Sequence, residues 1–185
     1  MNLSDRVGVV LAGGRSSRFG SDKFFHLVEG KEMGLRAVGA LSPVVDRVLV
    51  VGRHSIPEGW GATAVFGSRE GSGPLGAILD AAEHSRAETY LVMPCDMPFL
   101  GSTGVSQLSD ALSSSDRLAA FATMSPQTEP QWLAAAWNAE AIHDLVEPFF
   151  QSGGRSVRDV AQTVPHVLVS LLAHQLINVN ELADV

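Results

Sequence analysis

The sequence predicts an α/β protein in which a mostly parallel, twisted sheet carries helices on both faces. Short apolar runs rich in β-branched residues recur along the chain, and such runs are typical of strands that are buried on both faces. Segments with the helical spacing of apolar residues separate these runs. This alternation indicates parallel strands joined by right-handed crossovers. A chain of 185 residues is long enough for a sizeable core, so we expect one domain over residues 1–185.

The first part of the chain contains three predicted strands, with a helix between the first two. Apolar, β-branched runs predict the strands at residues 7–11, 48–51 and 62–66. Apolar residues at helical spacing predict the helix over residues 31–42. Pro43 ends this helix, because the residue before a proline disfavours the helical conformation.

The second half of the chain continues the alternation. Trp132 and Trp137 are interpreted as core aromatics, and Arg155 and Arg158 as surface residues near a helix end. The predicted elements, in chain order, are a strand at 89–94, a helix at 102–113, strands at 118–123 and 132–137, a helix at 139–150 and a helix that opens at 155–158.

Two glycines and three cations follow the first strand. Gly13 and Gly14 allow the backbone to approach a ligand because no Cβ is in the way, and free N–H groups in such a turn can surround an anion. Arg15, Arg18 and Lys23 add positive charge within the same loop. The glycine spacing matches neither the GxGxxG motif nor the P-loop. The alternative is a glycine turn before a solvated basic loop, but three cations behind a buried strand favour a phosphate site.

The segment GPLGAILDAAEHS, residues 73–85, is predicted to be an amphipathic helix. Pro74 suits the first helical position, where a missing N–H has no cost. Gly73 therefore lies at the helix N-terminus, where the backbone N–H groups and the helix dipole favour an anion. A plain helix start explains the same residues equally well.

An aspartate follows the strand predicted over residues 89–94. Open α/β sheets bind ligands beyond the carboxyl ends of their strands, so Asp96 and the glycine turn can face one crevice. A carboxylate there suits Mg²⁺, which accepts carboxylate oxygens and leaves room for phosphate oxygens. The alternative is a turn cap before Pro98. The neighbouring Cys95 is interpreted as inert rather than as a nucleophile, because no histidine lies near it in the sequence.

Two asparagines lie near the end of the chain. Asn178 and Asn180 each carry a hydrogen-bond donor and an acceptor, so they could bind a ligand edge or brace a pocket. An asparagine-rich turn before a terminal helix is the equal alternative.

Composition and charge exclude several classes of protein. A net charge of −7 argues against a nucleic-acid partner. Cys95 is the only cysteine, so no intramolecular disulfide can form, which suits a reducing compartment. The apolar stretch 164–179 is too short and too polar to span a bilayer, and the run at 7–12 is better explained as a strand than as a signal sequence. We therefore expect a cytoplasmic protein that does not bind membranes.

Four segments together resemble one known family. LAGGRSSRFGSDK, residues 11–23, is similar to the LAGGxSxRMGxDK signature of the molybdenum cofactor guanylyltransferases, which are Rossmann-like nucleotidyltransferases. The segments GPLG at 73–76, PCDMPFL at 94–100 and NVN at 178–180 resemble further elements of that family in the same order. The resemblance implies a three-layer Rossmann-like fold of the nucleotide-diphospho-sugar transferase type.

The resemblance also implies a set of site residues. Arg18, Lys23 and Asp96 correspond to catalytic positions of the family, and Asp96 would hold Mg²⁺. The residues implied to bind the nucleotide and the second substrate are Leu11, Ala12, Gly13, Gly14, Arg18, Lys23, Gly73, Pro74, Leu75, Asp96, Asn178 and Asn180.

The implied reaction is the Mg²⁺-dependent transfer of GMP from GTP to the phosphate of molybdopterin, with release of pyrophosphate. GTP and molybdopterin are thus the implied small-molecule partners. Transient contacts with proteins that deliver or receive the molybdenum cofactor are implied as well.

Two positions differ from the family pattern. The family commonly has an Asn after its second strand and an Asp before GPL, and these help to bind the base and ribose. Here the first place falls at Gly52-Arg53, and the loop between residues 66 and 73 offers Glu70 but no aspartate. Three alternatives therefore stay open: CTP as donor to the pterin, transfer to a sugar phosphate, and a non-catalytic nucleotide-binding relative.

Overall fold

A seven-stranded sheet forms the centre of the molecule. The computed structural model describes residues 5–13 and 22–180. In spatial order the strands are β5, β4, β1, β6, β8, β7 and β9. Only β8 runs antiparallel to its neighbours among these seven described strands, so the prediction of a mostly parallel sheet is confirmed. The strands are β1 (Arg6–Leu11), β4 (Arg47–Val51), β5 (Thr63–Val65), β6 (Thr89–Pro94), β7 (Ala119–Thr123), β8 (Gln131–Asn138) and β9 (His166–Ser170).

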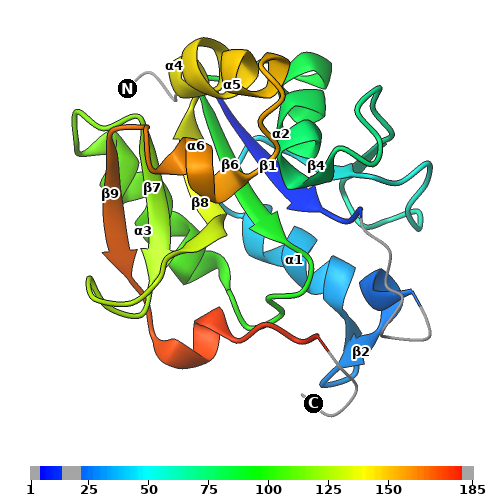
Figure 1. Ribbon diagram of the computed structural model, residues 1–185. Coiled ribbons are helices and arrows are strands. Elements are labelled where there is room, and N and C mark those ends of the chain that lie inside the picture. Colours follow the sequence, from blue (N-terminus) through cyan, green and yellow to red (C-terminus); the bar gives the residue numbers. More distant parts are fainter. Residues whose placement is uncertain (1–4, 14–21, 181–185) are drawn as a thin grey trace.

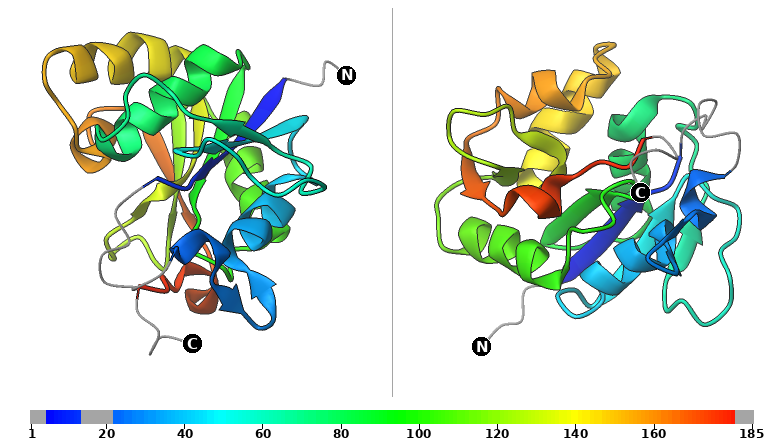
Figure 2. Two further views of the ribbon diagram at one scale, coloured as in Figure 1. Left: turned by 90° about the vertical axis from the view of Figure 1, so that its right-hand side faces the viewer. Right: turned by 90° about the horizontal axis from the view of Figure 1, so that it is seen from below.

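Helices cover both faces of the sheet, which gives the expected three layers (Figure 1, Figure 2). The helices α1 (Met33–Leu41) and α3 (Ser102–Ser113) pack on one face. The other face carries α2 (Gly73–His84), α4 (Ala139–Ala141), α5 (Glu147–Gln151) and α6 (Val157–Ala161). A π-helical turn, Ile142–Val146, joins α4 to α5, so the predicted helix over 139–150 is one helical segment with a widened turn. Short 3₁₀ turns lie at η1 (Lys23–Phe25) and η3 (Ala173–Leu176).

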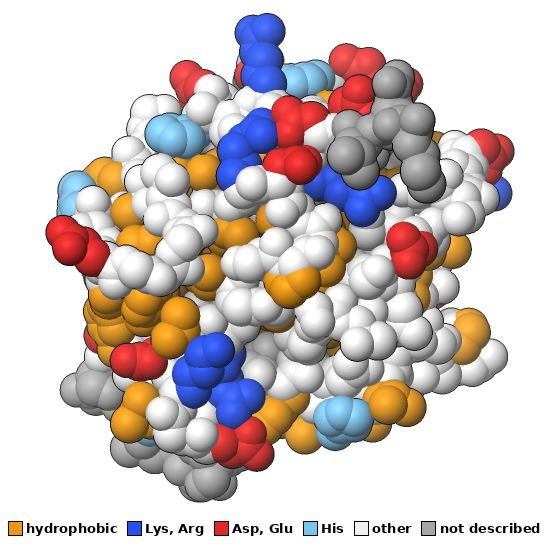
Figure 3. Space-filling model, turned by 180° about the vertical axis from the view of Figure 1, so that it is seen from behind, with side chains coloured by type: hydrophobic (Ala, Val, Ile, Leu, Met, Phe, Trp, Pro, Cys, Tyr) orange, Lys and Arg blue, Asp and Glu red, His pale blue; other side chains and the backbone are white. Residues whose placement is uncertain are grey.

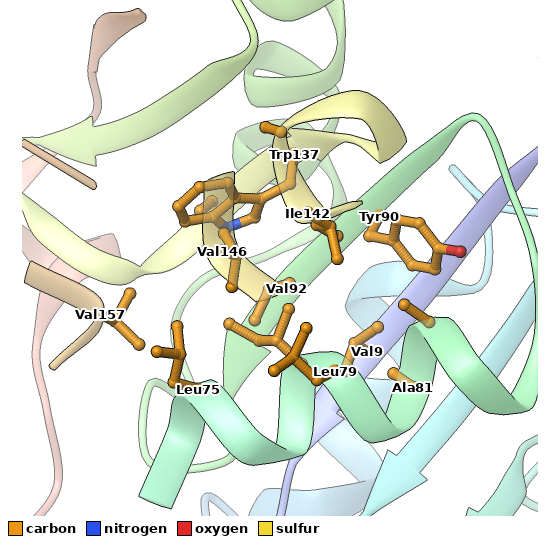
Figure 4. Packing of buried hydrophobic residues seen from close by; sticks show 14 of the residues in the cluster. Val9, Leu75, Leu79, Ala81, Tyr90, Val92, Trp137, Ile142, Val146 and Val157 are labelled. Atoms are coloured by element: carbon orange, nitrogen blue, oxygen red, sulfur yellow. The ribbon is translucent and has the colours of Figure 1, made fainter. Parts of the chain in front are cut away.

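Alternating side chains of the central strands supply one hydrophobic core on each face. Val9 and Val92 face α2, whereas Val10 and Met93 face α1 and α3. Figure 4 shows Leu79 of α2 directed toward Val9 and Val92. Burying such a side chain contributes about 1.5–3 kcal/mol relative to leaving it exposed. The two cores hold the strands firmly, so the strand ends that carry polar groups are fixed relative to one another.

The aromatic and basic residues singled out near β8 lie as interpreted. Trp137 is fully buried, and Trp132 packs edge-on against Phe121. Arg155 lies over the ring of Phe150, and the largely exposed Arg158 pairs with Glu129 at 3.3 Å.

Three strands were not predicted. The strands β2 (Leu27–Val28) and β3 (Lys31–Glu32) form a small hairpin whose turn residues, Glu29 and Gly30, have positive φ angles of 50° and 76°. The apolar stretch 164–179 divides into β9, which pairs parallel with β7, and the turn η3. Within the described residues, no helix is long and apolar enough to cross a membrane.

Charges of both signs are mixed on the surface. On the face shown in Figure 3, the described Lys and Arg side chains gather in small groups beside Asp and Glu. This mixture of charges agrees with the modest net charge of −7.

Candidate active site

The glycine turn after β1 touches the end of β4. The Ala12 N–H donates to the carbonyl of Val51 at 2.9 Å, and the Gly52 N–H donates to the carbonyl of Val65 at 2.9 Å. A Cβ placed on Gly52 would lie 2.6 Å from the Cα of Gly13. Gly52 also has a φ of +94°, which L side chains rarely adopt. Both the close approach and the backbone conformation therefore require glycine at residue 52.

We expect Gly52→Ala to lower the free energy of unfolding by about 3 kcal/mol or more, because it combines backbone strain with overpacking against Gly13. Gly59→Ala is the matched control. Gly59 has a φ of +84° but no atom within 4 Å of its added Cβ, so it carries the strain alone, about 1 kcal/mol. Urea unfolding of both variants measures the difference, and equal losses would contradict the close approach.

Three predicted site residues meet beyond the ends of β1 and β6. The Nζ of Lys23 lies 3.0 Å from Oδ2 of Asp96 and 3.0 Å from Oδ1 of Asn180. These residues are 73 and 157 positions apart from Lys23 in the chain. Lys23 opens the turn η1, whose N-cap is Asp22. A cation, a carboxylate and an amide are thus in direct contact at the sheet edge where α/β proteins bind ligands.

Backbone hydrogen bonds hold Asp96 at this place. The N–H of Cys95 donates to the carbonyl of Leu11 at 3.2 Å, which ties the end of β6 to the end of β1. The carbonyl of Asp96 accepts from the N–H of Val179 at 2.8 Å. Figures 1 and 2 show the C-terminal segment, in red, crossing below the ends of these strands. The last described residues therefore complete the site.

The donor set at this edge suits Mg²⁺ bound together with a phosphate. No cluster of three or more His, Cys, Asp or Glu side chains that could hold a metal occurs in residues 5–13 and 22–180. Asp96 is one partly exposed carboxylate, with 27% of its side-chain surface accessible, and a cationic ammonium already lies against it. Mg²⁺ is usually bound by one or two carboxylates, substrate phosphates and water rather than by a full protein cage. Asp96 could thus hold the ion when a phosphorylated ligand supplies the other oxygens.

The surroundings of Cys95, which precedes this carboxylate in the chain, disfavour its thiolate form. Burial raises the pKa of the Cys95 thiol to about 12, and the neighbouring Asp96 charge acts in the same direction. Only the thiolate is a good nucleophile, so the interpretation of Cys95 as inert agrees with its surroundings.

We expect Cys95 to react with iodoacetamide far more slowly than a free cysteine between pH 7 and 9, because its thiolate fraction follows a pKa of about 12. The alkylation rate should still be rising above pH 10 and reach the rate of a free cysteine only after denaturation. Mass spectrometry of the native and denatured protein measures both rates, and rapid native labelling at pH 8 would contradict the assignment.

The other predicted positions divide between the sheet edge and the core. Gly73 and Pro74 are exposed at the start of α2, and Gly73 has a φ of +76°. Leu11 ends β1, and Ala12 is half-buried next to it. The side chain of Leu75 is fully buried in the core (Figure 4), so only its backbone could face a ligand. The predictions for Gly14 and Arg18, as well as the charge of Arg15, concern positions outside the described residues.

The two asparagines have different partners. Asn180 accepts a hydrogen bond from Lys23, whereas the Nδ2 of Asn178 donates to Oε1 of Gln131 at 3.3 Å. Gln131 opens β8 on the same edge of the sheet. Asn178 therefore ties the C-terminal segment to β8, whereas Asn180 contacts the same lysine as Asp96.

A buried carboxylate fixes the loop before α2. Both the N–H and the guanidinium of Arg69 donate to Asp80, at 3.3 Å and 2.8 Å, and Asp80 is only 6% exposed. A Cβ on Gly67 would lie 2.0 Å from the carboxyl carbon of Asp80. Glu70, by contrast, is exposed. The loop before α2 has no aspartate at the family position, and Asp80 of α2 holds this loop through Arg69.

Sequence reasoning missed Arg53. This residue follows Gly52 at the end of β4 and forms an ion pair with Asp22. Two signals were present: its position directly after a predicted strand on the expected ligand edge, and the difference from the family pattern at Gly52-Arg53. A single arginine there is indistinguishable, from sequence, from a solvated surface residue.

A cation, a carboxylate and an amide gather at the carboxyl edge of a mostly parallel sheet, where α/β proteins bind ligands, and the comparisons give the chemistry of this protein as nucleotidyl transfer. The model of the MobA-like NTP transferase domain family matches residues 8–167. The chain therefore belongs to this family and is a nucleotidyltransferase.

Individual relatives agree with this assignment. A molybdenum cofactor guanylyltransferase of Ralstonia nicotianae is 32% identical, over 98% of this chain and 94% of that protein. The structure of molybdopterin-guanine dinucleotide biosynthesis protein A from Archaeoglobus fulgidus has a TM-score of 0.75 at 20% identity, over 96% of this chain and 94% of that one. The 2-C-methyl-D-erythritol 4-phosphate cytidylyltransferase of Thermus thermophilus has a TM-score of 0.73 at 17% identity, over 95% and 93%. The expected fold class is confirmed.

Proposed function

We propose that the protein transfers GMP from GTP to the phosphate of molybdopterin, with Mg²⁺, and releases pyrophosphate. The observation that carries the proposal is the contact of the Lys23 ammonium with the Asp96 carboxylate and the Asn180 amide at the end of β1. The name of the Ralstonia relative supports the choice of guanylyl group and molybdenum cofactor. The transient partners in this proposal are proteins that supply or accept the cofactor.

Different parts of the chain would bind the triphosphate and the metal ion. The backbone at Gly13 can approach the triphosphate because residues 13 and 52 carry no Cβ. Lys23 supplies a point charge to the phosphates, and the proposal extends this role to Arg18 from the family pattern. The N-terminus of α2, at Gly73, adds a favourable dipole for an anionic ligand. Asp96 would hold Mg²⁺, which neutralises charge on the phosphate oxygens when bound.

The transfer needs alignment more than acid–base chemistry. An oxygen of the molybdopterin phosphate attacks the α-phosphorus of GTP and forms the new P–O bond. The bond from the α-phosphorus to the bridging oxygen of the β-phosphate breaks, and pyrophosphate leaves with that electron pair. The attacking phosphate is already ionised, so no strong general base is required. Lys23 and Asp96 therefore contribute through positioning and charge neutralisation.

A competition assay tests the proposal. The protein is incubated with molybdopterin, Mg²⁺ and an equimolar mixture of GTP, CTP, ATP and UTP, and the products are separated by chromatography and mass. The expected result is the guanine dinucleotide with one pyrophosphate per product. A cytosine dinucleotide would replace the base assignment but keep the transferase class. Nucleotide binding without any pyrophosphate release would overturn the proposal in favour of a non-catalytic relative.

A further inference from the structure

Arg53 lies in a dense contact with the segment that carries Lys23. Its guanidinium carbon lies 4.2 Å from the ring centre of Phe24 and 5.0 Å from that of Phe25. The same guanidinium pairs with the carboxylate of Asp22, and only 17% of the Arg53 side chain is exposed. Asp22 and Phe24 flank Lys23 in the chain, and Phe25 follows Phe24. One arginine from the end of β4 thus contacts two residues of η1, Phe24 and Phe25, and its N-cap, Asp22.

The aromatic side of this contact is itself fixed. Phe24 is 1% exposed, and the ring of Trp60 lies 5.3 Å from it. A Cβ on Gly34 would lie 2.4 Å from the Phe24 ring, so α1 packs directly against it. Phe24 cannot move without disturbing α1. Phe24 therefore anchors η1 directly beside Lys23.

We propose that Arg53 is a positioning residue that acts through Asp22 to aim Lys23 at Asp96. Asp22 caps η1, because its Oδ1 accepts from the N–H of Phe24 at 3.1 Å. The ion pair with Arg53 fixes that carboxylate, and Lys23 is the next residue along the chain. The proposed function rests on Lys23, so the consequence for catalysis depends on that function, whereas the effect on the position of Lys23 does not.

The chemistry of arginine suits this role. A guanidinium is planar, so it can stack on aromatic rings while its edge donates to a carboxylate. Removal of one partner of this ion pair leaves the other charge without its partner, and Arg53 is the more buried of the two, with 17% of its side chain exposed against 45% for Asp22. Arg53 also lies near the place where the family commonly has a nucleotide-contacting Asn, and its guanidinium pairs with Asp22.

The position of Lys23 can be observed without any ligand. The chain has only two lysines, Lys23 and Lys31, so ¹³C-lysine labelling gives two assignable Cε–Hε signals. A side chain held in one place gives two distinct Hε shifts, whereas averaging over rotamers makes them equal. We expect distinct Hε shifts for Lys23 in the wild type and their loss in Asp96→Asn. Lys31, which is exposed, serves as the internal reference.

Three variants test the proposal. Arg53→Ala and Asp22→Asn should each collapse the Hε splitting of Lys23, and the double variant should do no more than either alone, because both remove one interaction. Asparagine at residue 22 still offers an oxygen to the Phe24 N–H, so Asp22→Asn keeps the cap and the fold even where Arg53→Ala unfolds. Arg47→Ala is the control, since the Arg47–Asp5 pair lies at the opposite end of β4.

The outcomes separate this proposal from the proposed function. If the Lys23 Hε shifts stay distinct in folded Asp22→Asn or Arg53→Ala, the positioning role is overturned. If they stay distinct in Arg53→Ala while GTP binding becomes weaker, Arg53 contacts the nucleotide directly. A collapsed Lys23 signal in a protein that transfers no nucleotide would keep the positioning role and reject the function. If the positioning role and the proposed function are both correct, kcat/KM should fall about tenfold in Asp22→Asn, because a misplaced Lys23 no longer aligns the phosphates for transfer.

Discussion

Asp96→Asn is expected to lower kcat by about a thousandfold or more while the protein stays folded. Asparagine keeps the size of the side chain but removes the negative charge that would hold Mg²⁺, so little charge neutralisation remains for the phosphates. The lost ion pair with Lys23 is partly exposed and contributes only about 1 kcal/mol to stability. The two effects should therefore separate: a near-complete loss of pyrophosphate release and a small change in the unfolding temperature.

Pyrophosphate release over a Mg²⁺ titration, together with thermal unfolding, measures both quantities. Asp110→Asn is the matched control, because Asp110 is an exposed aspartate of α3 away from the strand ends. It should retain activity within about twofold of the wild type. Near-normal, Mg²⁺-dependent turnover in Asp96→Asn would mean that this carboxylate is only a turn cap.

Lys23→Met is expected to lower kcat/KM for the nucleotide by about a hundredfold or more, because it deletes the one described cation that contacts Asp96. Methionine keeps an unbranched stem of similar reach, so the loss reports the charge rather than the packing. Lys31→Met is the matched control, since residue 31 carries the only other lysine. Initial rates at varied GTP separate the effect on KM from that on kcat. Activity of Lys23→Met within about twofold of Lys31→Met would exclude a role in phosphate binding.

Most of the fold could be predicted because its signals are local. Every strand of the sheet except β9 showed a short apolar run, and α3 matches its predicted range of 102–113. The hairpin of β2 and β3 was missed because two-residue strands carry no periodicity. The strand β9 was missed because His166 and the partly exposed residues after it gave no clear period of two.

The candidate site was predictable in its residue types but not in its contacts. Strand order puts the residues after β1 and β6 on one edge, so the meeting of Lys23 with Asp96 follows from topology. No local pattern indicates that the C-terminal segment returns to this edge, or that Asn180 contacts Lys23 while Asn178 turns to β8. The contact of Arg53 was not predicted either, because its partner, Asp22, lies 31 residues away in the chain.

The most direct measurement is calorimetric titration of GTP, CTP, ATP and UTP, with Mg²⁺, into the wild type and Asp96→Ala. We expect the wild type to bind GTP in preference to the other three, and we expect Asp96→Ala to bind it at least about tenfold more weakly, because the bound ion links the carboxylate to the phosphates. Equal affinity for all four nucleotides, undiminished in Asp96→Ala, would contradict both the guanylyl assignment and the metal site.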